Sequence, residues 1–266
     1  MDNLVVLEDN RGSLHRMSKE AIAGAQTLGG TVAALAIGEN AQAMANELSG
    51  VKLSEVITVD HELVSTYNAD GYTEVVTQVA KAESPNLILT GHSYQTRDFM
   101  PRVSAKLDIP FIPDIIAVEG TSYIKQVLNA KLSAAVTTSV SSAILSFQSA
   151  AFSDEDIAEG SCTSKPFDAD LSPEDVRSRS EEPFQEAAGD VDLESAELLI
   201  SIGRGIEKEE NITMAFDLAK ALGAEVCASR PVVDSGWVES FRQVGSSGQN
   251  VSPKLYFSLG ISGAIQ

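Results

Sequence analysis

The sequence predicts an α/β protein with two domains: an N-terminal doubly wound parallel-sheet domain with added antiparallel strands, and a smaller α/β domain after it. Short apolar runs rich in Val, Ile and Ala alternate with amphipathic segments over the first ninety residues, and the alternation starts again near residue 196. Such runs are typical of parallel strands that helices cover on both faces. We expect domains at 1–188 and 189–266, with 153–188 as an acidic connector.

Each element of the first domain has its own signal. The runs predict strands at 4–8, 31–38, 55–60 and 86–91, and the amphipathic segments predict helices at 18–30, 40–50 and 70–84. Glycine or a following proline ends each helix. The stretch 122–152 is rich in Ser, Thr, Val and Ala and predicts antiparallel strands added at one edge of the sheet. The connector is partly extended in this interpretation, and a surface meander fits it equally well.

The second domain repeats the alternation. A strand and glycine-rich loop are expected at 196–205, a helix at 210–223, a strand and loop at 224–231, and a last strand running into a turn at 254–266. Parallel sheets bind ligands outside the carboxyl ends of their strands. The candidate loops are therefore "GRG", "SRPVVDSGW" and "GISGAIQ".

Composition narrows the classes of partner. The chain has 266 residues and a formal net charge of −19, which argues against a nucleic acid or an anionic membrane surface and fits a basic patch on another protein. No apolar run approaches the roughly 20 residues that a membrane-spanning helix needs, so no direct membrane insertion is expected. The N-terminus has no leader pattern, and we expect a cytoplasmic protein, or a mitochondrial matrix protein after processing if it is eukaryotic.

The usual signatures of metal sites and hydrolases are absent from the sequence. Cys162 and Cys227 have no paired spacing, and His15, His61 and His92 lie far apart, so we expect no disulfide or metal site and treat the histidines as surface or loop residues. The chain has no GxSxG, HExxH or Walker motif.

The first candidate loop follows a strand directly. Gly203 and Gly205 permit a tight turn with close backbone approach to a phosphate, and Arg204 adds a fixed positive charge. The alternative is a glycine turn with an exposed arginine.

The second loop places Ser229 and Arg230 where a strand should end. Pro231 is expected to keep Arg230 out of helical geometry, so that a rigid turn holds its guanidinium at the sheet edge. Such a group suits an anionic or aromatic ligand. The alternative is an ion pair with Asp234.

Two turns of small residues flank the last strand. Gly245-Ser246-Ser247-Gly248 and Ser262-Gly263 offer hydroxyls and unhindered amides, which can hold phosphates or the polar edge of a heterocycle. A flexible loop is the alternative for the first of them. Two such turns beside Ser229 and Arg230 favour a nucleotide-like ligand.

Taken together, "GRG…ASRPVVDSGW…RQVGSSGQNVSPKLYFSLGISGAIQ" resembles the FAD-binding domain of the electron-transfer flavoprotein α subunit, and "GHSYQTRDFMPRVSAKLDIPFIPDI" resembles that family's N-terminal domain. The resemblance implies a Rossmann-like FAD-binding domain in a heterodimer whose partner β subunit carries AMP. It implies an electron carrier rather than an enzyme. Single electrons would pass from the acyl-CoA-type dehydrogenases of fatty acid β-oxidation to a membrane quinone reductase or another acceptor.

The resemblance assigns the FAD contacts residue by residue. Arg204 lies against the FAD, and Ser229 and Arg230 meet the flavin end. A fixed positive charge there favours a negatively charged reduced flavin. The loop that faces the flavin comprises Gln243, Val244, Gly245, Ser246 and Ser247, with the Ser247 hydroxyl in the place of a family threonine. The turn that cradles the phosphate and ribityl portion comprises Ser262, Gly263, Ala264, Ile265 and Gln266.

In the family the motif continues past the position of Gln266 with a histidine, a strand carrying an asparagine, and an acidic residue. The sequence therefore predicts a C-terminally truncated chain with an incomplete FAD-binding domain. Two alternatives follow from that incompleteness: a non-redox nucleotide-binding module, and a structural subunit that only docks another protein.

Overall fold

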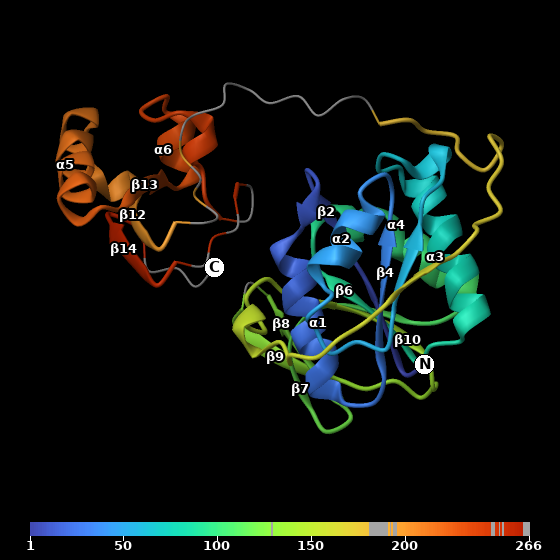
Figure 1. The fold of residues 1–266 in the computed structure, drawn as a ribbon. Coiled ribbons are helices and arrows are strands. Elements are labelled where there is room, and N and C mark those ends of the chain that lie inside the picture. Colours follow the sequence, from blue (N-terminus) through green and yellow to red (C-terminus); the bar gives the residue numbers. More distant parts are fainter. Residues whose placement is uncertain are drawn as a thin grey trace. The chain divides into compact units, whose positions relative to one another are not determined.

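The computed structural model divides the chain into two compact units, whose helices and strands Figure 1 labels. The structure describes residues 1–128, 130–180, 191, 193, 196–245, 248–249, 251 and 253–262. Unit 1 is Met1–Glu181 and unit 2 is Glu182–Gln266. The domain boundary expected after residue 188 lies outside the described residues and stays a prediction.

Unit 1 is built on a sheet that, in its described part, has nine strands in the order β11-β5-β4-β1-β6-β10-β7-β8-β9. The strands are β1 (Asn3–Val6), β4 (Val32–Ile37), β5 (Val56–Val59), β6 (Leu87–Gly91), β7 (Phe111–Glu119), β8 (Ser122–Val127), β9 (Leu132–Val136), β10 (Ala143–Phe147) and β11 (Ser164–Pro166). A small antiparallel pair, β2 (Asp9–Asn10) and β3 (Ser13–Leu14), follows β1.

Helices cover both faces of this sheet, as the continuous apolar runs predict. Alternate residues of β4 pack on opposite faces: Ala34 belongs to the core beneath α1 and α2, and Leu35 to the core beneath α3 and α4. The helices are α1 (Arg16–Leu28), α2 (Ala41–Glu47), α3 (Ala69–Glu83) and α4 (Tyr94–Leu107), with short 3₁₀ turns η1 (Glu62–Val64) and η2 (Asp154–Asp156). The predicted doubly wound parallel sheet is confirmed.

Local capping explains where two of these helices begin and end. Asn68 accepts a hydrogen bond from Gly71 N at 2.7 Å at the start of α3, and Ser84 ends that helix in the left-handed region. Ser93 accepts from Thr96 N at 3.1 Å at the start of α4. The sequence patterns did not predict α4, which contains Pro101.

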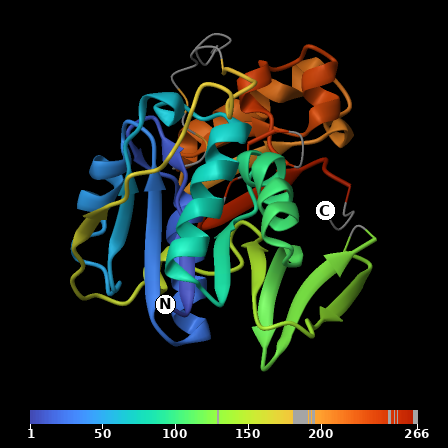
Figure 2. The ribbon, with the colours of Figure 1, turned by 90° about the vertical axis from the view of Figure 1, so that its right-hand side faces the viewer.

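The antiparallel addition is present, with one correction. Strands β7, β8 and β9 pair antiparallel at one end of the sheet, where Figure 2 shows β8 and β9 in light green. Strand β10, from the same Ser/Thr-rich stretch, instead lies inside the sheet, parallel to both β6 and β7. Its side chains are all buried, so its apolar content is that of a central strand.

The first part of the acidic connector packs on unit 1. Strand β11 pairs parallel to β5, Ala169 is buried, and Arg177 Nη2 lies 3.2 Å from Asp70 Oδ1. Ser164–Pro166 are extended, and these contacts with unit 1 fit a surface meander as well as an extended connector, so the connector stays a prediction.

Unit 2 contains, within its described residues, a three-stranded parallel sheet in the order β13-β12-β14. Its elements are β12 (Leu198–Ile202), β13 (Glu225–Ala228), β14 (Leu255–Leu259), α5 (Ile212–Leu222), α6 (Arg230–Asp234) and the 3₁₀ turns η3 (Arg204–Ile206), η4 (Glu209–Asn211) and η5 (Ser240–Arg242). Ala215 and Ala219 of α5 pack on Ile200 and Val226 of the sheet. No helix among the described residues of the chain has the length and apolar character to cross a membrane.

Candidate functional site

The carboxyl ends of β12, β13 and β14 lie side by side, because the three strands are parallel and in register. Gly203 N donates to Leu259 O at 2.8 Å, and Ser229 N donates to Ile202 O at 2.9 Å. The three loops that the sequence singles out therefore begin at one edge of one sheet. Parallel sheets bind ligands at this edge.

The glycine loop and the turn after β14 pack backbone against backbone. Gly205 N donates to Gly260 O at 2.7 Å, and a Cβ on Gly203 would lie 2.4 Å from the same oxygen. The backbone of the GRG loop was expected to approach a phosphate, but it approaches the end of β14 and the turn after it instead. The Gly203 and Gly205 amides already donate hydrogen bonds to Leu259 O and Gly260 O. Arg204 is exposed, which is the arrangement of the simpler alternative, a glycine turn with an exposed arginine.

Ser229 and Arg230 mark the change from strand to helix. Ser229 is extended, with φ −75° and ψ 153°, and α6 begins at Arg230. The expectation that Pro231 keeps Arg230 out of helical geometry is wrong, because proline is well tolerated in a helix's first turn and disfavours a preceding helical residue without forbidding it.

The Arg230 guanidinium is in contact with one acidic side chain. Its Nε lies 3.3 Å from Asp234 Oδ2, and the Arg230 side chain is 65% exposed. The alternative of an Arg–Asp pair is therefore present. Ion pairs this exposed are weak, about 0–1 kcal/mol, so the pair leaves the guanidinium accessible to an anionic or aromatic ligand.

The segment that follows η5 runs along the outer edge of β13. Gln243 pairs with Ala228 in a parallel bridge, in which Val244 N donates to Ala228 O at 3.0 Å. Gly248 N donates to Gly245 O at 2.9 Å, and Gln249 N donates to Gln243 O at 2.8 Å. Gln243, Val244 and Gly245 are thereby brought next to Ser229 and Arg230.

The other predicted residues divide into two groups. Ser262 follows β14 and is exposed at the same edge as the GRG loop. The remaining ones lie outside the described residues: Ser246, Ser247, Gly263, Ala264, Ile265 and Gln266.

Arg242 belongs to this region, and sequence reasoning missed it. Its Nη1 donates to Val226 O at 2.8 Å, and its side chain is only 13% exposed. Its place directly before the predicted flavin-facing loop was the one available signal. Nothing in the local sequence indicates that the side chain is buried.

One face of the sheet carries a small polar group. Tyr256 Oη donates to Ser201 Oγ at 2.6 Å, and Cys227 lies opposite Ser201 on β13. Burial raises the pKa of the Cys227 thiol and of the Tyr256 hydroxyl. Cys227 is therefore a neutral thiol at pH 7, which fits a packing role and not a nucleophile.

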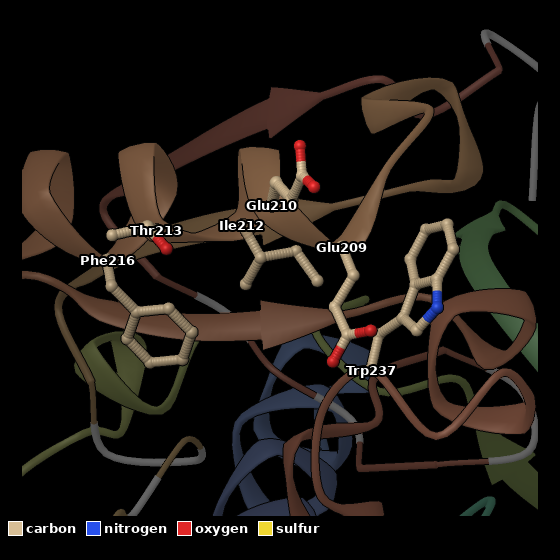
Figure 3. A pocket seen from close by; sticks show the side chains of 6 residues that line it. All are labelled: Glu209, Glu210, Ile212, Thr213, Phe216 and Trp237. Carbon is tan, nitrogen blue, oxygen red and sulfur yellow. The ribbon is translucent and has the colours of Figure 1, made fainter.

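A groove of about 600 Å³ lies beside the N-terminal end of α5 (Figure 3). Ile212 and Phe216 from the helix and Trp237 from the segment after α6 form its apolar lining, and Glu209 and Glu210 add negative charge. None of the predicted FAD-binding residues lines this groove. Its two carboxylates oppose the diphosphate of a dinucleotide.

The three histidines have local structural roles. His15 Nδ1 accepts from Met17 N and His61 Nδ1 accepts from Leu63 N, both at 3.1 Å, so each caps a helical turn. His92 Nδ1 lies 2.8 Å from Ser146 Oγ, and burial lowers the pKa of its imidazole. The described residues include no His, Cys, Asp and Glu group suited to a metal ion.

The sheet edge of unit 2 fits a flavin dinucleotide through its side chains. Arg204 and Arg230 present exposed guanidinium groups that can meet phosphate oxygens or lie on an aromatic ring. Ser229 makes no side-chain cap bond to α6, and Ser262 is exposed, so both hydroxyls can form hydrogen bonds with a ligand. The fit comes from these groups and not from the Gly203 and Gly205 amides.

Comparison with known proteins agrees with this geometry. Residues 3–170 match the electron transfer flavoprotein domain, and residues 192–266 match the electron transfer flavoprotein FAD-binding domain. The electron transfer flavoprotein subunit alpha of Bacillus subtilis is 33% identical over 272 residues, covering 99% of this chain and 82% of that protein. The same subunit of Thermoanaerobacterium thermosaccharolyticum is 32% identical over 276 residues, covering 100% and 84%. A probable mitochondrial electron transfer flavoprotein subunit alpha of Caenorhabditis elegans is 32% identical over 273 residues, covering 99% and 79%.

Fold and site define a two-domain α/β flavoprotein, in which unit 2 is an FAD-binding domain and FAD is the cofactor. The chain belongs to the electron transfer flavoprotein alpha subunit family. By family it is an electron carrier.

Proposed function

We propose that this chain carries FAD at the carboxyl edge of β12, β13 and β14 and passes single electrons between other proteins. The donors would be acyl-CoA-type or related flavin dehydrogenases, and the acceptor a membrane quinone reductase or another oxidant. The observation that carries the proposal is that all seven described residues among those predicted to bind FAD follow these three strands or lie along β13.

Residues of the chain supply the binding and the electrostatics. FAD, when bound, supplies a ring that accepts and releases electrons. Arg230 is proposed to place a positive charge next to that ring and so to favour its reduced, negatively charged form. Arg204 is proposed to lie against the FAD. The turn that cradles the phosphate and ribityl portion is proposed to comprise Ser262, Gly263, Ala264, Ile265 and Gln266. Gln243, Val244, Gly245, Ser246 and Ser247 are proposed to face the flavin.

The partner subunit is part of the proposal. The relatives are named as alpha subunits, and we infer a heterodimer with a β subunit that carries AMP. One relative is bacterial and another is named as mitochondrial. We infer that this chain is located in the bacterial cytoplasm or the mitochondrial matrix.

The test is to purify the chain together with an electron transfer flavoprotein β subunit and to record its absorption spectrum with and without added FAD. We expect a yellow complex that is reduced in single-electron steps by an acyl-CoA dehydrogenase and its substrate. Titrations of the chain without the β subunit, with FAD, NAD, ATP and AMP, serve as the comparison, because the β subunit is itself expected to bind AMP. Tighter binding of an adenine nucleotide than of FAD by the chain alone would support a non-redox nucleotide-binding module, and a colourless complex that takes up no FAD would support a docking subunit.

A further inference from the structure

The outer edge of β13 is completed by an arginine side chain. β13 is the end strand in the order β13-β12-β14. Val226 and Ala228 are two residues apart, so their carbonyl groups point to the same side, away from β12. Arg242 Nη1 donates to Val226 O at 2.8 Å, and Val244 N donates to Ala228 O at 3.0 Å. One side chain and one main-chain amide thus donate the hydrogen bonds that a neighbouring strand would otherwise donate to these two carbonyl groups.

The Arg242 guanidinium also lies over two aromatic rings. Its central carbon lies 5.2 Å from the centre of the Phe216 ring and 5.4 Å from that of Phe241. Figure 3 shows Phe216 projecting from α5. Arg242 therefore joins α5, β13 and the segment after η5 at one point.

Among the residues that the structure describes, the one acidic side chain paired with the Arg242 guanidinium is that of Glu239. Nε lies 3.5 Å from Glu239 Oε2 without forming a hydrogen bond, and the Glu239 side chain is 64% exposed. A buried guanidinium is costly unless its hydrogen bonds and packing compensate. The compensation on this edge is the bond to Val226 and the two rings, which fix the side chain in one place.

We propose that Arg242 is a positioning residue for the start of the predicted FAD-binding loop, Gln243, Val244 and Gly245, a role that rests on the proposed function. By tying the start of this loop to β13, Arg242 sets where Gln243, Val244 and Gly245 lie relative to Ser229 and Arg230. The second tie, Val244 N to Ala228 O, depends on the first because only one residue separates them. Lysine has no flat guanidinium that can both donate to Val226 and lie over the two aromatic rings.

The experiment compares Arg242→Met and Arg242→Lys with the unchanged chain and with Lys254→Met. Lys254→Met is the matched control because it removes the same charge from unit 2, at an exposed ion pair with Glu197 away from β13. Hydrogen exchange of the Val244 and Gln249 amides is measured without FAD, and the dissociation constant for FAD is measured by flavin fluorescence.

In R242M we expect both amides to exchange about tenfold faster or more, because a hydrogen bond to a charged group is lost, while the Ala219 amide of α5 keeps its rate. We expect FAD to bind at least about tenfold more weakly, with R242K between R242M and the unchanged chain and K254M unaltered. Unchanged exchange at Val244 and Gln249 would overturn the proposal. Equal acceleration at Ala219 would overturn it too, because it would mark general loss of stability.

The two hypotheses fail separately. If the unchanged chain takes up no FAD, the proposed function is wrong, and the exchange rates still decide whether Arg242 holds the segment. If R242M loosens the segment and FAD affinity is unchanged, Arg242 is not a positioning residue for FAD, and the proposed function stands.

Discussion

At the scale of a single residue, we expect Arg230 to affect the potential of bound flavin but hardly the stability of the fold. Its ion pair with Asp234 is exposed, so Arg230→Ala should change the free energy of unfolding by less than about 1 kcal/mol. The midpoint potential of bound flavin should fall, by on the order of 60 mV, which is a tenfold change in a one-electron equilibrium. Urea unfolding and spectroelectrochemistry measure the two effects. A Lys220→Ala variant, in the last turn of α5, serves as the control. An R230A protein that holds FAD at the original potential would contradict the assignment.

Glu8 gives a pH-dependent test in unit 1. Burial raises the pKa of its carboxyl above the usual 4.5, and a hydrogen bond to the Ser93 hydroxyl offsets only part of that rise. The folded chain therefore keeps the Glu8 proton to higher pH than the unfolded chain. The stability this contributes is complete below the unfolded pKa and is lost as pH rises through the folded pKa.

Glu8→Gln preserves the shape of the side chain and stays uncharged. The stability of E8Q relative to the unchanged chain should therefore rise from pH 4 to pH 8, most steeply between the unfolded and the folded pKa of Glu8. Urea unfolding followed by circular dichroism at several pH values measures this difference. A difference that stays constant with pH would contradict the raised pKa.

At the scale of elements, the contact between the GRG loop and the turn after β14 depends on glycine. Gly260 has φ +68°, and a Cβ there would lie 2.4 Å from Gly205 C and from Ile206 N. Gly260→Ala adds a backbone clash to the left-handed strain and should cost roughly 2–4 kcal/mol. Trp237, the single tryptophan of the chain, reports unfolding of unit 2 by fluorescence.

Gly223→Ala is the control for that substitution. Gly223 has φ +66°, similar to Gly260, and a Cβ there would meet nothing within 4 Å. It should cost only about 1 kcal/mol, the strain term alone. Equal losses for G260A and G223A would show that the loop contact adds nothing to the stability of unit 2.

Sequence patterns predicted those helices and strands in which the spacing of apolar residues is regular. The run at Val32–Ile37 and the stripe of α3 specify a buried strand and a covering helix without further information. Helix α4 was missed because Pro101 and a polar first turn weaken its pattern. Strand β10 was misplaced because a short apolar run does not say which neighbours it will have.

The candidate site divides in the same way. Strand ends and loop residues could be located from sequence, since the carboxyl edge of a parallel sheet follows from connectivity. The acceptor of each amide could not be predicted from sequence, because the hydrogen bonds of Gly203 and Gly205 depend on how closely the turn after β14 approaches the GRG loop. The burial of Arg242 depends likewise on α5, which is distant in sequence.

At the scale of the whole molecule, the two units should respond differently to FAD. Unit 1 has two large cores on a sheet of nine described strands, whereas the described part of unit 2 has two smaller cores on a sheet of three strands. Smaller units bury a smaller share of their surface and are less stable. Unit 2 should therefore unfold at lower urea concentration than unit 1, giving Trp237 fluorescence a lower midpoint than the main circular dichroism change.

FAD should then raise the unit 2 transition alone. A ligand that binds only the folded form stabilises it by about 2.7 kcal/mol at one hundred times its dissociation constant. The Trp237 midpoint should rise with FAD concentration, while the unit 1 transition stays fixed because the predicted contacts all lie in unit 2. AMP at equal concentration is the control and should move the Trp237 midpoint less than FAD does. A shift of both transitions by FAD would place part of the binding free energy in unit 1, and the FAD site would then extend beyond the carboxyl edge of β12, β13 and β14.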